Sequence, residues 1–266
     1  MSMTSGLMVT RPLEQWDGKA LGLSDYLKLV KGWGTETLDI FEPFFEVCPP
    51  AELRTALSDH GLRCACCYAA ADLVAIGAEA EARGDDAIKL GIENAAAVGA
   101  PLLFTYGSQH GHAGEENFQR YIGRLGDLLP LFQGTGITFV VENAGALMHR
   151  PQDMHRMMEV LALGGLRLCQ DTGNFYLWEQ DEVAAVALLA DWTVHFHVKD
   201  YVDRHRKAPL SPGATDVNLG EGAVRHSPVL EALRQAGYEG VLALEPHTAQ
   251  AIAPGLQTLN RWIAGT

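Results

Sequence analysis

Residues 137–142 read ITFVVE, an apolar run that ends in Glu142. Three later runs repeat the pattern, since LRLCQD ends in Asp171, TVHFH in His197 and VLALE in Glu245. Each run is followed by a loop and a helical pattern, which is typical of buried strands in a parallel sheet. Barrels of alternating strands and helices place their catalytic residues at such strand ends. The sequence therefore predicts an α/β fold, a (β/α)₈ barrel with these four side chains at its catalytic face.

The rest of the chain fits the same plan, because strand and helix patterns alternate without a linker, charge block or low-complexity segment. We therefore expect residues 1–266 to form one barrel domain. The expected strands are Leu7–Thr10, Thr37–Phe41, Leu62–Tyr68, Pro101–Tyr106, Ile137–Glu142, Leu166–Asp171, Thr193–Val198 and Val241–Glu245. The expected helices are Ser24–Trp33, Pro50–His60, Asp85–Val98, Glu115–Phe132, Pro151–Leu163, Asp181–Ala190, Ser227–Ala236 and Pro254–Ile263. Two long connections, 9–23 and 199–226, are expected to cover the catalytic face.

Composition limits the partners and the compartment. The chain has 20 Lys and Arg against 33 Asp and Glu, a formal net charge of −13, which disfavours nucleic acid and a basic membrane-binding face. No apolar run is long enough to span a membrane, and residues 1–10 do not resemble a signal peptide. The five cysteines are an odd number, which indicates reduced thiols rather than a disulfide framework. A cytoplasmic protein is expected.

The alternation of side chains along a strand predicts what lies beneath the four strand-end residues. If those residues point into the barrel, the next layer down is Val140, Cys169, His195 and Ala243. By the same count Thr193 and Arg167 also point inward, and Arg167 would need a carboxylate partner.

The cysteines of the third expected strand test the same alternation. Cys64 and Cys66 should face one way and Cys67 the other. This arrangement, with no second cysteine pair elsewhere, favours small buried side chains over a zinc site.

Three carboxylates and an imidazole suit one divalent cation, Mn²⁺ or Mg²⁺ in preference to Co²⁺ or Zn²⁺. A single carboxylate at a strand end is more often the N-cap of the next helix. Four in succession make the metal site the better interpretation. His195 fits a supporting or core histidine better than a fifth ligand, although it could also contact substrate.

Several segments carry a family resemblance. VVENA with Glu142, CQDTGN with Asp171, HFHVKD with His197, and NLGEG followed by ALRQAGYEGVLALE up to Glu245 resemble the sugar phosphate isomerase/epimerase, or xylose isomerase-like, superfamily. The resemblance covers nearly the whole chain and is most specific over residues 137–247. It implies one divalent metal ion held by all four residues. It also implies that Glu142 and Glu245 flank the substrate as an acid/base pair.

The chain departs from the ketose 3-epimerases of this superfamily at two positions. Asn174 stands where those enzymes have a histidine, and Asp203 where they have an arginine, with Arg204 adjacent. The substrate of that branch therefore cannot be transferred. Candidate substrate contacts are Trp16, Tyr68, Tyr106, Asn174, His195, Lys199 and Arg204.

Three functions remain open. A metal-dependent sugar isomerase or epimerase would move a proton next to a carbonyl through an enediolate, using the two glutamates. A dehydratase in the same fold would expel a β-hydroxyl from a keto-polyol. A non-catalytic carbohydrate-binding or assembly subunit would have less need of four intact ligands. The expected partner is a small carbohydrate, phosphorylated or not, and homo-oligomers remain open. The acidic charge argues against the endonucleases of this fold.

Overall fold

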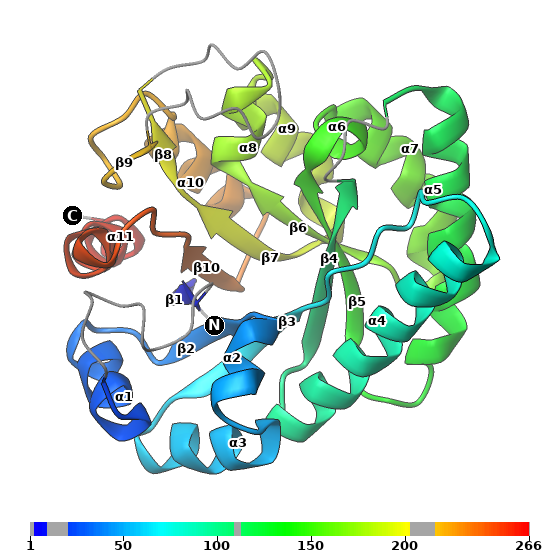
Figure 1. Ribbon diagram of the computed structural model, residues 1–266. Helices are drawn as coiled ribbons and strands as arrows, with labels where there is room; N and C mark the ends of the chain where they lie inside the picture. Colours follow the sequence, from blue (N-terminus) through cyan, green and yellow to red (C-terminus); the bar gives the residue numbers. More distant parts are fainter. Residues whose placement is uncertain (1–2, 10–20, 109–112, 203–215, 266) are drawn as a thin grey trace.

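A computed structural model describes residues 3–9, 21–108, 113–202 and 216–265. Within these ranges the strands of the main sheet are parallel and close into a barrel, in the order β1-β10-β7-β6-β5-β4-β3-β2. Helices form a ring around the strands (Figure 1). The predicted (β/α)₈ barrel is therefore confirmed.

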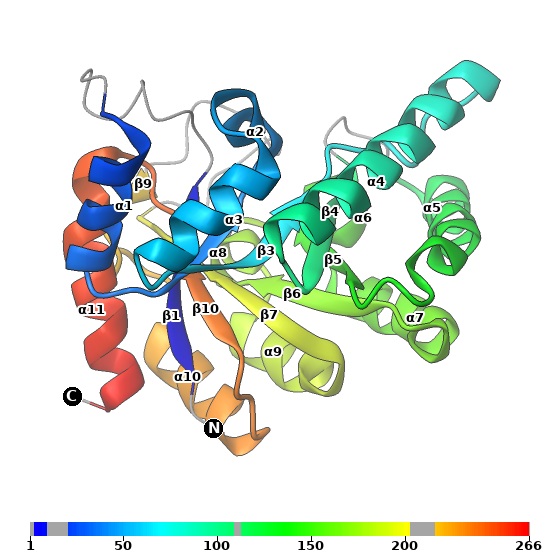
Figure 2. The same cartoon turned by 90° about the horizontal axis from the view of Figure 1, so that it is seen from below.

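The barrel strands are β1 (Thr4–Val9), β2 (Thr37–Ile40), β3 (Arg63–Tyr68), β4 (Leu102–Ser108), β5 (Thr138–Ala144), β6 (Arg167–Asp171), β7 (Thr193–Val198) and β10 (Val241–Leu244). The longer helices are α1 (Leu23–Gly32), α3 (Pro50–Asp59), α4 (Ala78–Val98), α5 (Glu115–Leu128), α7 (Pro151–Leu161), α9 (Glu182–Leu189), α10 (His226–Gln235) and α11 (Ile252–Ala264). In the described part of the chain, none of the helices has the length and apolar character needed to cross a membrane. Figure 2 shows the helices flanking the barrel from a second direction.

Most expected elements match in position, with differences at their ends. Helix α4 begins at Ala78 rather than Asp85, because the intervening alanines, glutamates and arginine favour a helix. Short elements that the sequence did not predict follow several strands at the mouth of the barrel. These are the helices α2 (Glu42–Val47), α6 (Gly145–Met148) and α8 (Thr172–Leu177), and an antiparallel pair of β8 (Asp200–Tyr201) with β9 (Asp216–Val217).

Apolar side chains pack in two layers. The larger layer lies between the strands and the surrounding helices, and Phe139 and Phe132 stack there with ring centroids 4.4 Å apart. The smaller layer fills the inside of the barrel and includes Met8, Phe104 and Val140. The barrel is thus filled with side chains below its mouth.

An irregularity in β3 overturns the expected facing of the cysteines. The register against β2 shifts so that Ala65 is an extra residue, a bulge that reverses the alternation locally. Cys66 points into the barrel, whereas Cys64 and Cys67 share the outer layer, their Sγ atoms 3.8 Å apart. All five cysteines are buried and free, as expected.

A second irregularity, between β6 and β7, corrects the prediction for Thr193. The register shift makes Val194 the extra residue, and Val194 packs against the inner layer. The Thr193 hydroxyl instead accepts a hydrogen bond from Gln170 and donates one to the carbonyl of Leu189. His195 remains inside the barrel.

Arg167 also differs from expectation. Its guanidinium donates to the carbonyl oxygens of Ala162 and Leu166, so backbone acceptors satisfy it in place of the expected carboxylate. Carbonyl oxygens at a helix end are suitable acceptors for a cation.

Replacing Phe139 by alanine should destabilise the protein strongly. Its side chain is 1% exposed and stacks on Phe132, so Phe139→Ala leaves a cavity and should lower the free energy of unfolding by about 3–5 kcal/mol. Leu163→Ala is the control, because Leu163 is 99% exposed and should change the value by about 0.5 kcal/mol or less. Urea denaturation measures both, and equal losses would contradict the assignment of the core.

Candidate metal centre

The four strand-end side chains meet at the mouth of the barrel. One ligand atom from each of Glu142, Asp171, His197 and Glu245 lies within 4.8 Å of the others. Glu142 is on β5, Asp171 ends β6, His197 is on β7 and Glu245 follows β10. These strands are consecutive neighbours in the barrel, so their carboxyl ends lie side by side and bring all four side chains together. The first three are 1% exposed or less.

The two carboxylate oxygens of Asp171 have different roles. Oδ1 accepts a hydrogen bond of 2.8 Å from the backbone N–H of Asn174 and caps α8. Oδ2 is buried and accepts no hydrogen bond from the described residues. The N-cap and metal-ligand interpretations of Asp171 are therefore compatible, because each needs a different oxygen.

Asn143 fixes the backbone of Asp171. Its amide Nδ2 donates to the Asp171 carbonyl at 2.9 Å, and its Oδ1 accepts from the Asp171 N–H at 2.6 Å. Asn143 is completely buried. The sequence analysis quoted this residue in VVENA but gave it no role. Its position directly after Glu142, at a strand end, was the signal that could have identified it.

Lys199 also enters the cluster. Its Nζ lies 2.7 Å from Glu245 Oε2 and 3.2 Å from Asp171 Oδ2. The missing side chain of Gly173 makes this approach possible, because a Cβ there would lie 2.5 Å from Lys199 Cγ. Burial lowers the pKa of Lys199, but the carboxylates of Asp171 and Glu245 outweigh this and raise the pKa well above its usual value. The lysine is thus a fixed cation beside two of the candidate ligands.

A further acid, which the sequence analysis missed, lies below the four side chains. Asp39 of β2 is completely buried, and its Oδ2 is 2.6 Å from His195 Nε2 and 3.2 Å from His197 Nε2. The other ring nitrogen of His197, Nδ1, is 2.5 Å from Glu142 Oε1. Burial raises the pKa of Asp39, but the two histidines lower it to about 2. The only sequence signal was a charged residue inside a short apolar strand.

The charges and donor atoms of the mouth suit a divalent cation. Among the described residues, the positive partners of Glu142, Asp171 and Glu245 are Lys199 and, when it is protonated, His197. Burial, together with the neighbouring glutamates, raises the pKa of Asp171 to about 7 despite the opposing effect of Lys199. An excess of negative charge at the mouth is a feature that a bound cation would relieve.

The remaining candidate substrate contacts differ in their distance from the four candidate ligands. Tyr106 is paired in register with Glu142, and burial and the charges of Glu142 and Glu245 raise the pKa of its phenol. Tyr68 stacks obliquely on Tyr106, with ring centroids 4.7 Å apart, so both line the inside of the barrel near the cluster. Asn174 is half-buried in the first turn of α8. His195 lies on the floor with Asp39, away from the mouth, which favours the supporting role over substrate contact. Trp16 and Arg204 lie outside the described residues.

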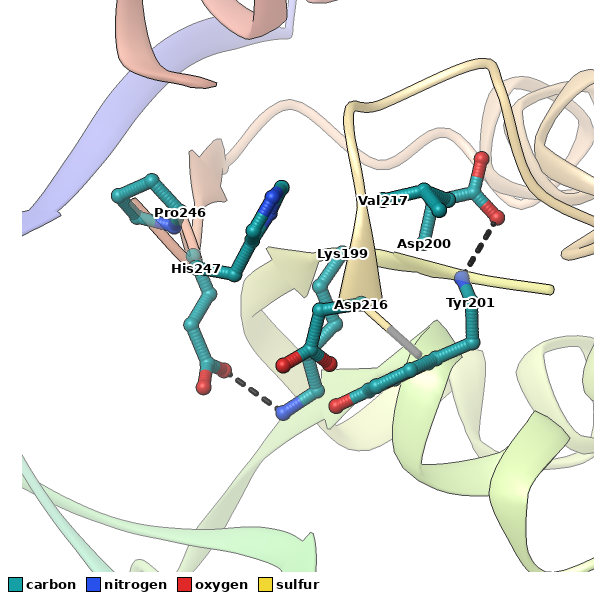
Figure 3. A pocket seen from close by; sticks show the side chains of 8 residues that line it. Lys199, Asp200, Tyr201, Asp216, Val217, Pro246 and His247 are labelled. Atoms are coloured by element: carbon teal, nitrogen blue, oxygen red, sulfur yellow. Dashed lines mark hydrogen bonds and ion pairs between the residues drawn. The ribbon is translucent and has the colours of Figure 1, made fainter. Parts of the chain in front are cut away.

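A small cavity of about 60 Å³ adjoins the cluster. Its lining includes Lys199, Tyr201, Asp216, Glu245 and His247, and the ion pair between Lys199 and Glu245 forms one side of it (Figure 3). These side chains offer both donors and acceptors, as a polyol would require. A larger cavity of about 590 Å³ lies at the opposite end of the barrel, where the strands begin, and contains none of the four candidate ligands.

Asp200 holds the segment beside this cavity. Its Oδ2 accepts from the N–H groups of Gly220 and Gly222, at 2.9 and 3.0 Å, and its Oδ1 accepts from Val224 and Tyr201. A Cβ at Gly222 would lie 2.1 Å from Asp200 Oδ1, so glycine is required there. NLGEG is therefore a backbone cradle around a buried carboxylate, which fixes one end of the long connection after β7.

Fold and site together define a parallel barrel with a carboxylate-rich mouth. The chain belongs to the xylose isomerase-like TIM barrel family, whose model matches residues 27–264. Among known proteins it is 30% identical, over 121 residues, to an Escherichia coli (strain K12) protein assigned as an L-ribulose-5-phosphate 3-epimerase. That match covers 44% of this chain and 41% of the relative, so it spans less than half of either protein.

Solved structures share the fold at low sequence identity. The IOLI protein with a bound zinc atom superposes with a TM-score of 0.83 at 14% identity, over 99% of each chain. AsbF of Bacillus anthracis, assigned as a 3-DHS dehydratase, gives a TM-score of 0.80 at 15% identity, over 97% of this chain and 99% of its own. At such identities the likeness establishes the fold alone.

Removing the Asn143 clamp should be costly. Asn143→Ala leaves the buried N–H and carbonyl of Asp171 without partners, which should lower the free energy of unfolding by roughly 2–4 kcal/mol. Asn117→Ala is the matched control, since the half-buried Asn117 bonds only the exposed Ala113 carbonyl and Arg120 among the described residues and should cost less than about 0.5 kcal/mol. Denaturant titration compares them. A neutral Asn143→Ala would show that the clamp contributes nothing.

Proposed function

We propose that this protein is a divalent-metal-dependent sugar isomerase or epimerase. The observation that carries the proposal is the convergence of Glu142, Asp171, His197 and Glu245 at the mouth of a barrel of this family. Mn²⁺ or Mg²⁺ suits the three carboxylates best, and Co²⁺ or Zn²⁺ would also accept the imidazole. The zinc bound by a protein of the same fold is consistent with such a site.

In the proposed reaction the two glutamates are the acid/base pair. Strands β5 and β10 are separated by β6 and β7 in the barrel, so Glu142 and Glu245 approach the mouth from different sides. One carboxylate can take a proton from the carbon beside a carbonyl, and the other can return a proton to the opposite face or to the neighbouring carbon. A bound cation would supply stabilisation of the negative charge that develops on the substrate oxygens. Lys199 holds Glu245 in position and can donate to a substrate hydroxyl.

The substrate is a keto-sugar or a sugar phosphate. The small cavity with Tyr201, Asp216 and His247 offers hydrogen bonds to hydroxyl groups next to the reacting carbon. The epimerase relative acts, by its name, on a pentulose phosphate. The residues 204–207, whose basic side chains could bind a phosphate, lie outside the described residues. A dehydratase is the second candidate, because a structure of similar fold carries that assignment.

Metal content should depend on each of the four side chains. Glu142→Ala, Asp171→Ala, His197→Ala and Glu245→Ala should each lower the metal bound per chain, because each removes one ligand from the cluster. Glu221→Ala is the control, since it removes the exposed carboxylate of the NLGEG segment, which is not part of the cluster. Elemental analysis after dialysis against Mn²⁺ measures the content. Full occupancy in any two of the four variants would reject the site.

Proton transfer by the glutamates should appear as exchange with solvent. In D₂O, the product formed from a ketose or ketose phosphate should carry deuterium on a carbon beside the carbonyl. Metal-saturated Glu142→Gln and Glu245→Gln should lose at least about a hundredfold in rate, because an amide cannot accept the proton. Glu52→Gln, on the exposed face of α3, should react normally.

Mass spectrometry and NMR of the product distinguish the outcomes. Conserved mass apart from deuterium, with an inverted centre or a shifted carbonyl, supports the proposal. A product lighter by one water establishes the dehydratase. Absence of exchange across ketoses, keto-polyols and their phosphates, with metal bound, would contradict both.

A further inference from the structure

The floor of the barrel holds a second group of charged side chains under the candidate metal centre. Asp39 Oδ2 lies between two histidines, 2.6 Å from His195 Nε2 and 3.2 Å from His197 Nε2. All three side chains are 1% exposed or less. The contact crosses the barrel interior, since β1 and β10 separate β2, which carries Asp39, from β7, which carries His195.

The backbone fixes this contact from both sides. Asp39 is paired in register with Met8 and Cys66, which also point into the barrel. His195 lies on the inner face because it is two residues before His197 and in register with Cys169, after the bulge at Val194. The two imidazole rings lie edge to face, with centroids 5.2 Å apart and planes at 90°. Both Nε2 atoms can therefore reach the same oxygen.

Stability alone does not account for Asp39. Its second oxygen, Oδ1, and the Nδ1 atom of His195 are buried and have no hydrogen-bond partner in the described part of the protein. A buried carboxylate with an unsatisfied oxygen is costly, and an apolar side chain of similar volume is often as stable or more so. The surrounding layer of Met8, Phe104 and Val140 would accept such a side chain. The acid therefore has another role.

We propose that Asp39 is a positioning residue for His197 in the metal site, an inference that rests on the proposed function. Asp39 Oδ2 accepts a hydrogen bond from Nε2–H of His197, so the proton stays on that nitrogen. Nδ1, which lies 2.5 Å from Glu142 Oε1 and donates to it in the metal-free protein, is then the nitrogen that would release its proton and bind a cation. His195 donates from its own Nε2–H to the same oxygen and keeps the carboxylate in place.

The chemistry of histidine explains why this matters. A neutral imidazole carries its proton on either nitrogen, and only the unprotonated nitrogen can bind a cation. Carboxylates that accept from the other nitrogen of a ligating histidine set this choice and the ring orientation, and losing them typically weakens metal binding about 10–100-fold. In Asp39→Asn the amide can present N–H groups to His197 Nε2, which would favour a proton on Nδ1, at the metal position.

Metal affinity tests the inference directly. Calorimetric titration of the metal-free protein with Mn²⁺ should show binding by Asp39→Asn that is about 10–100-fold weaker than in the original protein. His195→Gln should weaken binding less, because Asp39 keeps its contact with His197. Thr105→Val is the matched control, since Thr105 is equally buried and on β4 but bonds only the carbonyl of Ala69. It should lose stability without losing affinity.

The position of the proton on His197 supplies a second readout that a purely structural role would not change. With Zn²⁺ bound, ¹⁵N NMR of the imidazole nitrogens, assigned with His197→Gln, should show a proton on Nε2 in the original protein. Asp39→Asn should show a mixture or a proton on Nδ1. An unchanged proton position and unchanged Mn²⁺ affinity in Asp39→Asn would overturn the inference.

The outcomes also separate this inference from the proposed function. If the original protein binds no metal, both fail. If it binds one ion and Asp39→Asn binds equally well, only the role of Asp39 fails. Two ions per chain, one of them lost in Asp39→Asn and in His195→Gln, would mean that Asp39 is itself a ligand, and would overturn its assignment as a positioning residue.

Discussion

Buried negative charge is the constraint on which the rest of this structure depends. Asp39, Glu142 and Asp171 are buried inside one barrel, where charges interact strongly and solvation is weak, and the half-buried Glu245 lies beside them at the mouth. Each carboxylate therefore needs a positive or donating partner. The histidines of β7 serve Asp39 and Glu142, and Lys199 serves Asp171 and Glu245. Among the described residues, these partners leave a net negative charge at the mouth of the barrel, and such a charge suits a bound cation.

Several features of the backbone bring these partners within hydrogen-bonding distance of the carboxylates. Gly173 has no side chain, so Lys199 can pass over α8 to the carboxylates. Asn143 ties the end of β5 to the backbone of Asp171, so two candidate ligands move as one unit. Regular alternation after the bulge in β7 puts His195 and His197 on the same inner face, where both reach Asp39. Such contacts hold the candidate ligands in place, as a metal site or a proton transfer would require.

The two ends of the barrel differ in what they contain. The mouth holds the carboxylates, the small polar cavity and the cradle around Asp200. The cavity at the other end is larger but has mainly apolar walls and lacks the candidate ligands. Size alone would therefore select the end of the barrel that lacks the candidate ligands. Barrels place their chemistry at the carboxyl ends of their strands, where loops can vary without disturbing the core.

The sequence by itself determined the barrel and the four candidate metal ligands. Each of these is local information, because an apolar run, its length and its final residue can be read from a few adjacent positions. The tertiary structure alone decided the facing of Cys64 and Thr193, the partners of Arg167, and the contacts of Asp39, Asn143 and Lys199. Bulges depend on how a strand pairs with its neighbours, and one extra residue reverses the inward and outward sides. The partners of Asp39 and Lys199 come from strands far away in the chain, and only closure of the barrel brings them together.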